Sequence, residues 1–368
     1  MNVWLKLFLL VITTSALLFG FVNAAPGAGP VSFERLHVFL FNLCAGGFLL
    51  LCHSGGGTVT RRSALFIAGA LAFTASAALD LYPAAIGSAL LLAVIVESER
   101  TRRFSFFPRD FFSGESSASD RFLHASLLCL STAITISAAM MIVKTYTGFT
   151  LPPKLDIDIF FLGFSFPVSL VTMSVMFSFI GKPATRLERF LHDLSFWAVN
   201  AGVIVFFVFI VAGWEFAQAV ISMALFASVV VIFILFLRGA PGIQRKSILA
   251  SGMAMLVMSA LTGIGYIAAR HFDPSGPAGT VPRMVLAAHG YISLYGWNQT
   301  GMLVIMRHGD FPLRFRPWIF NSLHWIAVAV LAPLGESWMP AGLAAAFLYA
   351  FTFARAFFAG GSAAAHRA

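Results

Sequence analysis

The sequence predicts an all-α, polytopic membrane helix bundle of about twelve transmembrane helices, with both termini cytoplasmic. Of the 368 residues, 59% are hydrophobic and only 11% are charged, and the mean hydropathy is +0.87. Soluble domains carry about 25% charged residues. Apolar stretches of roughly 20 residues, the length that crosses a bilayer, also recur along the whole chain.

We expect one integral membrane domain over residues 1–368. The expected helices lie at about 4–24, 33–53, 62–80, 82–98, 121–145, 157–181, 190–213, 216–237, 246–269, 283–306, 316–333 and 338–358. The third and fourth are joined tightly by Asp80-Leu81-Tyr82-Pro83, where a miscount is easiest.

The first helix ends in Val22-Asn23-Ala24, which resembles a small-residue signal-peptidase site. Its apolar run is longer than a usual signal core, so residues 1–24 are expected to stay as an uncleaved, signal-like first helix. Cleavage would leave eleven helices with the same sidedness.

The positive charges test the helix count, because Lys and Arg collect on the cytoplasmic side of a bundle. With a cytoplasmic N-terminus, only five of the 24 basic residues fall outside, and 19 fall inside. The five are Arg35, Lys144, Lys154, Arg270 and Arg283. This asymmetry predicts a multi-pass protein of the bacterial cytoplasmic (inner) membrane, and it explains the net charge of +9 by contact with anionic lipid rather than with nucleic acid.

The sequence shows no motif typical of a soluble catalytic domain. The longest loop, 99–120, is cytoplasmic, and its Phe-Pro-Arg-Asp-Phe-Phe portion is either an interfacial amphipathic element or a plain connector. The chain has no Walker motif, dinucleotide fingerprint or CxxC, and its three cysteines do not form a disulfide or metal pattern.

Chemistry is therefore expected from polar residues inside the membrane, where each is costly. Among nine histidines, only His37 and His289 share the outer layer of the bilayer. The inward ends of three other helices carry His124, His192 and His324, which are expected to reach interfacial water, with proton entry beside Asp193 as the alternative.

Small and polar residues surround both outer histidines. In "ERLHVFLFNLCAGG", α-helical spacing places Phe41, Cys44 and Phe48 on the face of His37, next to Asn42, Gly46 and Gly47. In the helix that contains "AHGYISLYGW", Ser293, Gly296 and Thr300 continue the face of His289, and Tyr291, Tyr295 and Asn298 form a neighbouring polar stripe. Small residues let a flat or bulky group approach the backbone.

These two stretches resemble helices II and X of the catalytic subunit of haem-copper oxidases, especially the nitric-oxide-reductase and cbb3-type branches. The family has twelve core helices, a helix II histidine, and a His-x-His pattern followed by Tyr/Trp-Gly on helix X. The resemblance covers two motifs of about fifteen residues each and the helix count.

The departures from the family pattern limit what the resemblance implies. His289 matches the first histidine of helix X, but Tyr291 occupies the second position. The helix at 157–181 has no histidine for a copper site, and the helix at 190–213 has only His192. Copper is therefore not expected.

The resemblance implies a degenerate relative that holds one haem b with His37 and His289 as ligands, beside Tyr291 and Tyr295. The haem propionates would face Arg35 and Arg283. Such a protein would serve respiratory electron transfer, sensing or assembly, with a periplasmic electron carrier or other respiratory membrane subunits as partners. If it is an enzyme, it is a membrane oxidoreductase.

Two alternatives stay open at this stage. The histidines and the small-residue stripes are also compatible with ordinary helix packing. The chain would then be a membrane transporter, or a structural or accessory subunit of a larger membrane complex, without a cofactor.

Overall fold

The computed structural model describes residues 2–24, 31–113, 116–147, 149, 153–239, 243–273 and 279–361, apart from the side chains of 24, 153, 154, 156–162 and 243. Lys154 is therefore outside the described side chains. Within the described chain the protein is all-helical, as predicted: no strand forms, and an isolated bridge joins Leu313 and Gly361. Twelve helical rods are present, and ten are long and apolar enough to cross a membrane.

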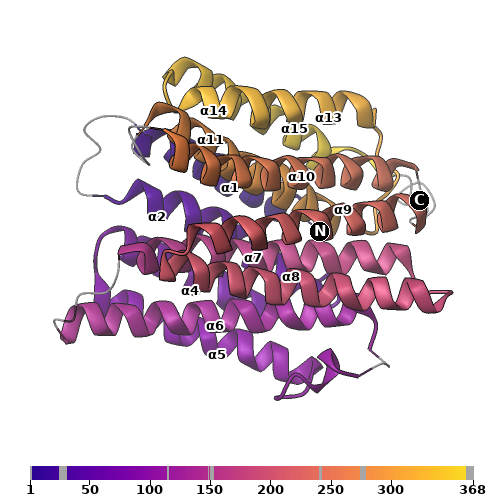
Figure 1. Cartoon of the computed structure of the whole chain (residues 1–368), viewed down its shortest axis with the longest axis horizontal. Helices are drawn as coiled ribbons and strands as arrows, with labels where there is room; N and C mark the ends of the chain where they lie inside the picture. The colour runs from indigo at the N-terminus through magenta and orange to yellow at the C-terminus, as the bar shows by residue number, and fades with distance from the viewer. Residues whose placement is uncertain are drawn as a thin grey trace. The chain divides into compact units, whose positions relative to one another are not determined.

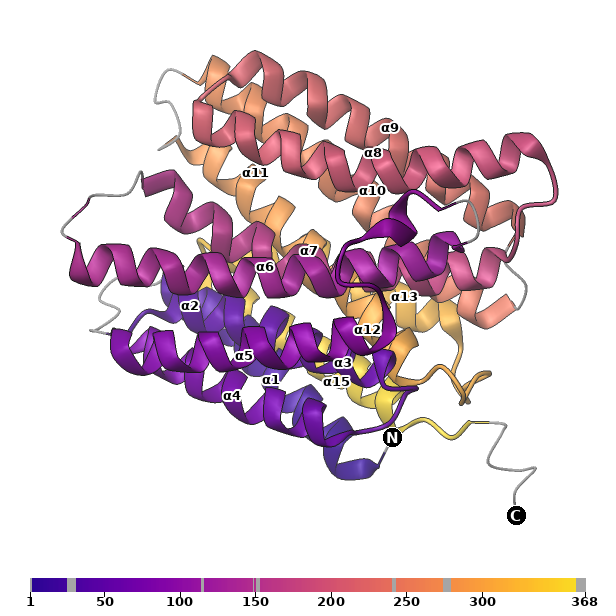
Figure 2. The same cartoon turned by 90° about the horizontal axis from the view of Figure 1, so that it is seen from below.

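The chain divides into two compact units, Met1–Ser174 and Val175–Ala368, and each is described by itself. The helices of the N-terminal unit are α1 (Val3–Ala24), α2 (Phe33–Val38), η1 (Phe39–Gly47), α3 (Phe48–Ser54), α4 (Arg61–Ala78), α5 (Tyr82–Arg103), η2 (Arg109–Phe111), α6 (Ala118–Tyr146) and most of α7 (Pro153–Ile180). Consecutive helices pack together: α1 on α2 and η1, α4 on α5, and α5 on α6 (Figures 1 and 2).

The C-terminal unit follows the same pattern of antiparallel neighbours. Its helices are α8 (Arg186–Ala212), α9 (Glu215–Gly239), α10 (Ile243–Phe272), α11 (Thr280–Tyr291), η4 (Ile292–Asn298), α12 (Gln299–Met306), α13 (Pro317–Trp325), η5 (Ile326–Leu331), α14 (Ala332–Gly335) and α15 (Met339–Phe358). Helices α8, α9 and α10 lie side by side, and α10 also packs on the rod formed by α11, η4 and α12 (Figures 1 and 2).

Local signals in the sequence explain where these helices begin and end. Thr60 and Ser63 form a reciprocal capping box at the start of α4, and Thr185 and Glu188 form another at the start of α8. Helix α8 ends at Gly213, which adopts the left-handed conformation that glycine tolerates.

The tight connection between α4 and α5 separates two distinct helices. Asp80 has a φ of 54°, a left-handed conformation that Asp adopts more readily than most residues. Its carboxylate accepts hydrogen bonds from Tyr82 (2.9 Å) and from Arg35 on α2 (2.5 Å). These bonds hold the turn, so the third and fourth predicted helices are separate.

Three rods contain a π-helical segment, which is the rarest of the regular helices and is often found at functional sites. The segments are η1, η4 and η5. Each begins two or three residues after a histidine, namely His37, His289 and His324. The predicted helix faces rest on α-helical spacing throughout, so none of the three π-helical segments was predicted.

The predicted loop at 99–120 is too long. Helix α5 continues to Arg103 and α6 begins at Ala118, so the connection covers 104–117. The prediction was wrong at the end of α5 because charged residues there stabilise the helix instead of ending it. Arg102 pairs with Glu99 (2.5 Å) and Arg100 pairs with Glu97 (2.8 Å), both at i,i+3 spacing.

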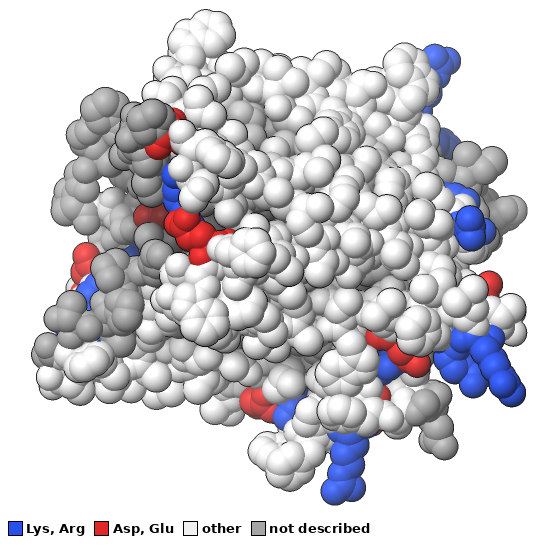
Figure 3. Space-filling model, in the orientation of Figure 1, with Lys and Arg blue, Asp and Glu red and all other residues white. Residues whose placement is uncertain are grey.

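Charged side chains gather near helix ends within each unit. On the face drawn in Figure 3, they leave a broad uncharged area over the helices between them. In the N-terminal unit, Arg35 and Asp80 pair at one end and Arg62 and Glu99 at the other. In the C-terminal unit, Arg270 pairs with Glu215 at 2.8 Å. A broad uncharged surface with charged ends is what a bilayer environment requires.

Candidate functional site

The ring of His37 is hydrogen-bonded to the helix that precedes it. Its ring Nδ1 lies 2.8 Å from the backbone carbonyl oxygen of Ala16 on α1. A carbonyl oxygen only accepts hydrogen bonds, so Nδ1 carries the proton and donates. The lone pair of the neutral ring is then on Nε2. The His37 side chain is half-buried, not enclosed.

His289 repeats this arrangement in the C-terminal unit. Its Nδ1 lies 2.8 Å from the carbonyl oxygen of Ser259 on the preceding helix, α10, and 3.3 Å from the Ser259 hydroxyl. A Cβ on Gly263 would lie 3.1 Å from Nδ1, so this glycine makes room for the ring. His289 therefore also holds its lone pair on Nε2, and it is also half-buried.

This tautomer is the one that metal-ligating histidines show, because the second ring nitrogen of such a ligand usually donates to a carbonyl or carboxylate that fixes its orientation. His324 differs. Its Nε2 lies 2.6 Å from the carbonyl oxygen of Tyr295, and its side chain is only 1% exposed. Of the three histidines that precede a π-helical segment, only His37 and His289 thus direct Nδ1–H at a carbonyl.

Four arginines and tyrosines were predicted to lie beside the haem. Three of them make contacts inside the protein, and the fourth, Arg283, is exposed. The Arg35 guanidinium donates to Asp80 and to the carbonyl oxygen of Ala77 (2.7 Å), so it holds the α4–α5 turn. Arg283 is exposed near the start of α11. Tyr291 donates to the Glu336 carboxylate at 2.7 Å, and Tyr295 is fully buried with its ring edge-on to Tyr349.

Two members of the predicted face of His289, Gly296 and Thr300, lie toward the helix that His289 contacts. Gly296 packs against Met255 and Thr300 against Gly252, both on α10, the helix that also receives the His289 hydrogen bond. Tyr291 and Tyr295 instead face α14 and α15, as a separate stripe.

The predicted face of His37 is wrong. Cys44 contacts Thr74 on α4 at 3.4 Å, whereas His37 contacts α1. The nine-residue segment η1 lies between them, and its wider turn moves Cys44 to another face. A Cβ at Gly46 would overlap Val168 of α7, so protein fills the space that the sequence analysis assigned to a flat group.

The inner histidines do not reach interfacial water as predicted, because all three are buried. His124, His192 and His324 are 0%, 5% and 1% exposed. His124 accepts a hydrogen bond at Nε2 from Arg100 (2.9 Å) and stacks on Phe104, and His192 packs edge-on against Phe177. Aromatic neighbours on the adjacent elements replace the solvent that the sequence analysis expected.

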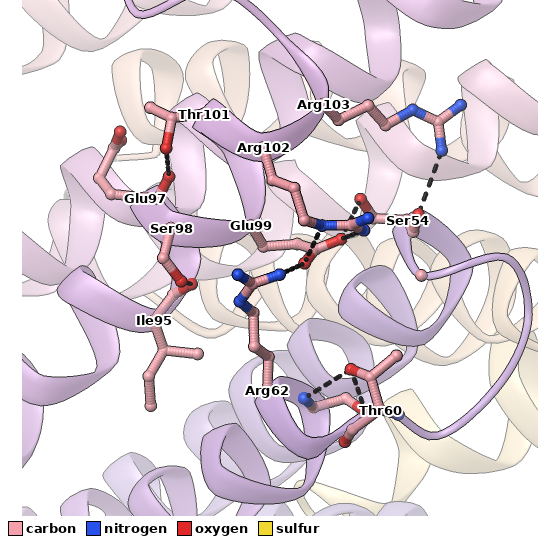
Figure 4. Close-up of polar contacts among 12 residues, drawn as sticks. Ser54, Thr60, Arg62, Ile95, Glu97, Ser98, Glu99, Thr101, Arg102 and Arg103 are labelled. Atoms are coloured by element: carbon pink, nitrogen blue, oxygen red, sulfur yellow. Dashed lines mark hydrogen bonds and ion pairs between the residues drawn. The ribbon is translucent and has the colours of Figure 1, made fainter.

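A second polar group, which the sequence analysis did not identify, joins α3, α4 and α5 (Figure 4). Glu99 is 2% exposed, and its carboxylate accepts from Ser54 (3.0 Å), Arg62 (3.2 Å) and Arg102 (2.5 Å). Three donors around one buried carboxylate compensate its desolvation, which makes this a structural clamp. The run "ESERTRR" was the available signal, but it was assigned to the loop.

Two buried amides stand apart from these satisfied groups. Asn42 in η1 and Gln299 at the start of α12 are both fully buried, and neither side chain has a hydrogen-bond partner among the described residues. Both lie on the helices that carry His37 and His289.

Comparison with protein-family models and with curated proteins gave no match to this chain. The functional argument therefore depends on the residues themselves.

Proposed function

We propose that this protein is a haem b-binding integral membrane protein in which Nε2 of His37 and Nε2 of His289 are iron ligands. The observation that carries the proposal is the pair of equivalent Nδ1–H bonds, each to a carbonyl of the preceding helix at 2.8 Å. These bonds orient each ring and leave Nε2 as the basic nitrogen.

The donor set supports a haem better than a bare ion. A bare transition-metal ion is usually held by three or four protein side chains. No group of three His, Cys, Asp or Glu side chains suited to an ion occurs in the described part of the chain. A haem supplies four equatorial nitrogens and needs only one or two histidines from the protein. When bound, it would supply one-electron chemistry or binding of a diatomic gas.

The arginines have different parts in this proposal. Arg283, exposed near the start of α11, is the residue we assign to a propionate carboxylate. Arg35 is committed to Asp80 and the α4–α5 turn, so we assign it a structural role. Tyr291 and Tyr295 belong to the face toward α14 and α15, and they position η4 without touching the ligand.

We propose further that all twelve helices cross the bacterial cytoplasmic membrane, with both termini inside. Two of them, Arg61–Ala78 and Thr280–Met306, are less apolar than the other ten. Several of their polar residues have internal partners, such as Ser76 with the carbonyl oxygen of Ala72 and Tyr291 with Glu336, which lowers the cost of crossing.

A spectroscopic experiment tests the haem assignment. The detergent-purified protein is expected to show a b-type pyridine haemochrome and a reduced-minus-oxidised spectrum at a fixed haem-to-protein ratio. His37→Ala and His289→Ala should each lower the Soret absorbance while the protein stays in the membrane. His271→Ala is the matched control, because His271 is exposed and lies beside Glu215 outside the proposed ligand set.

A colourless, folded wild-type protein would overturn the haem proposal. The function would then be that of a transporter, or of a structural or accessory membrane subunit. The two single variants also report how many haems are held: loss of the whole spectrum in either variant means that both histidines serve one haem.

A further inference from the structure

The connection between α5 and α6 is held in a defined conformation by one buried arginine. Arg100 is 2% exposed, and its guanidinium donates to the carbonyl oxygens of Ser105 and Phe106, both at 3.0 Å, and to Nε2 of His124. Glu97 neutralises it from the same helix at 2.8 Å. The loop is therefore fixed to the ends of the two helices that it joins.

This fixed loop sorts its five phenylalanines into two sets. Phe104 and Phe111 face inward onto the His124 ring, at centroid distances of 4.5 and 4.9 Å. Phe106, Phe107 and Phe112 face outward and are 69%, 67% and 78% exposed. Large aromatic side chains exposed together on one short loop mark a surface that contacts an apolar environment.

The surface around these rings is basic. Arg109 is exposed between them, and the side chains of Arg102 and Arg103 are 49% and 38% exposed just before them. Asp110, the acidic residue of the segment 104–113, lies 3.4 Å from the imidazole of His124, and its side chain is 32% exposed. Arginines therefore flank the exposed phenylalanines, and the carboxylate of this segment is partly engaged by His124.

We infer that the segment Phe104–Ser113 is a docking surface for anionic phospholipid, with Phe106, Phe107 and Phe112 inserted at the headgroup–acyl boundary. The segment directly follows the last turn of α5, which is long and apolar enough to cross a membrane. If α5 crosses, the segment lies where the helix leaves the hydrocarbon. Aromatic rings with flanking cations are the composition that binds this layer. Each arginine near an anionic surface adds to the attraction.

This inference does not depend on the haem, because no residue of the segment belongs to the proposed ligand set. It requires only that α5 and α6 end at a bilayer surface. A colourless protein would leave it intact.

Site-specific labelling tests the inference on the full-length protein. Cysteines are introduced singly as Phe107→Cys and Phe112→Cys, in a background in which the three native cysteines are alanine, and are labelled with an environment-sensitive fluorophore. The protein is reconstituted into vesicles of phosphatidylcholine, with or without phosphatidylglycerol. We expect blue-shifted emission that is quenched by nitroxide-bearing lipid and protected from iodide, more strongly with phosphatidylglycerol.

Two control variants make the result specific. Thr58→Cys, on the exposed α3–α4 connection, should be quenched by iodide and not by nitroxide lipid in either vesicle. Adding Arg109→Gln to Phe112→Cys should abolish the extra effect of phosphatidylglycerol and keep the insertion. Iodide quenching without lipid quenching at both 107 and 112 would overturn the inference, as would equal behaviour of positions 58 and 112.

Discussion

At the scale of single residues, the two histidine-bearing rods contain buried amides of two kinds. Asn42 and Gln299 have no hydrogen-bond partner within the described chain, whereas Asn298 is equally buried and makes an interaction. A buried polar group without a partner costs about 1–3 kcal/mol, because its hydration is lost and nothing replaces it. We therefore expect the free energy of unfolding to change in opposite directions when Asn42 and Asn298 are each replaced by leucine.

Replacing Asn42 by leucine should stabilise the protein. The two side chains have the same number of non-hydrogen atoms and the same branching, and the variant removes an uncompensated amide, so we expect the free energy of unfolding to rise by about 1 kcal/mol. Asn298→Leu should lower it, because that change removes an interaction. Thermal denaturation in detergent measures both. A lower Tm for Asn42→Leu would show instead that this amide binds water or a ligand.

At the scale of helices, close approach in the N-terminal unit depends on Gly46. Its position leaves no room for a Cβ beside Val168 of α7, which is 1% exposed. Gly46→Ala should destabilise the protein by about 1–3 kcal/mol through overpacking. Val168→Ala, which frees the space, should recover most of that loss in the double variant. Additive losses in the thermal unfolding of the three variants would contradict this packing argument.

The helices could be predicted from the length of the apolar runs and the placement of the charges. The helix face on which each candidate site residue lies could not always be predicted. Capping boxes such as Thr60 with Ser63 are visible in sequence, and Asp80 was recognised as part of a turn. The π-helical segments are invisible, because π and α turns have the same composition and differ only in spacing. That is why Cys44 was placed on the wrong face of its rod.

The turn between α4 and α5 gives a pH dependence with a defined sign. The hydrogen bond from Arg35 holds the pKa of Asp80 below its ordinary value. A lowered folded-state pKa means that this bond stabilises the fold above the unfolded value of about 3.9, and that the contribution is lost as the pH falls through the folded-state pKa.

Asp80→Asn removes the charge and keeps a residue that tolerates the left-handed conformation. The effect should be small, because the Asp80 side chain is 53% exposed. The Tm of the wild type should therefore fall slightly more than that of the variant when the pH is lowered from about 6 to about 3. Parallel curves would show that Arg35 contributes no charge-dependent stability.

At the scale of the whole molecule, the two units use the same device with unrelated sequences. In each, a backbone carbonyl oxygen of one helix accepts a hydrogen bond from a histidine on the next rod, and a π-helical segment follows that histidine. Both of these rods also carry an amide that has no partner in the described chain.

The side of the membrane on which two loops lie distinguishes twelve membrane crossings from ten. If Arg61–Ala78 and Thr280–Met306 cross with the other ten helices, the α6–α7 connection is outside and the α7–α8 connection is inside. If these two do not cross, both connections exchange sides, while the termini stay where they are.

Thr147 and Ala184 are exposed residues in these two connections, and neither carries a charge that would bias orientation. Thr147→Cys and Ala184→Cys should be labelled by a membrane-impermeant maleimide from the outside and from the inside, respectively, in sealed vesicles of known orientation. The twelve-helix arrangement places the 19 inner basic residues on one side, so it is the arrangement favoured by the charge rule. The reverse labelling would mean ten crossings, and would move the segment Phe104–Ser113 to the outer leaflet.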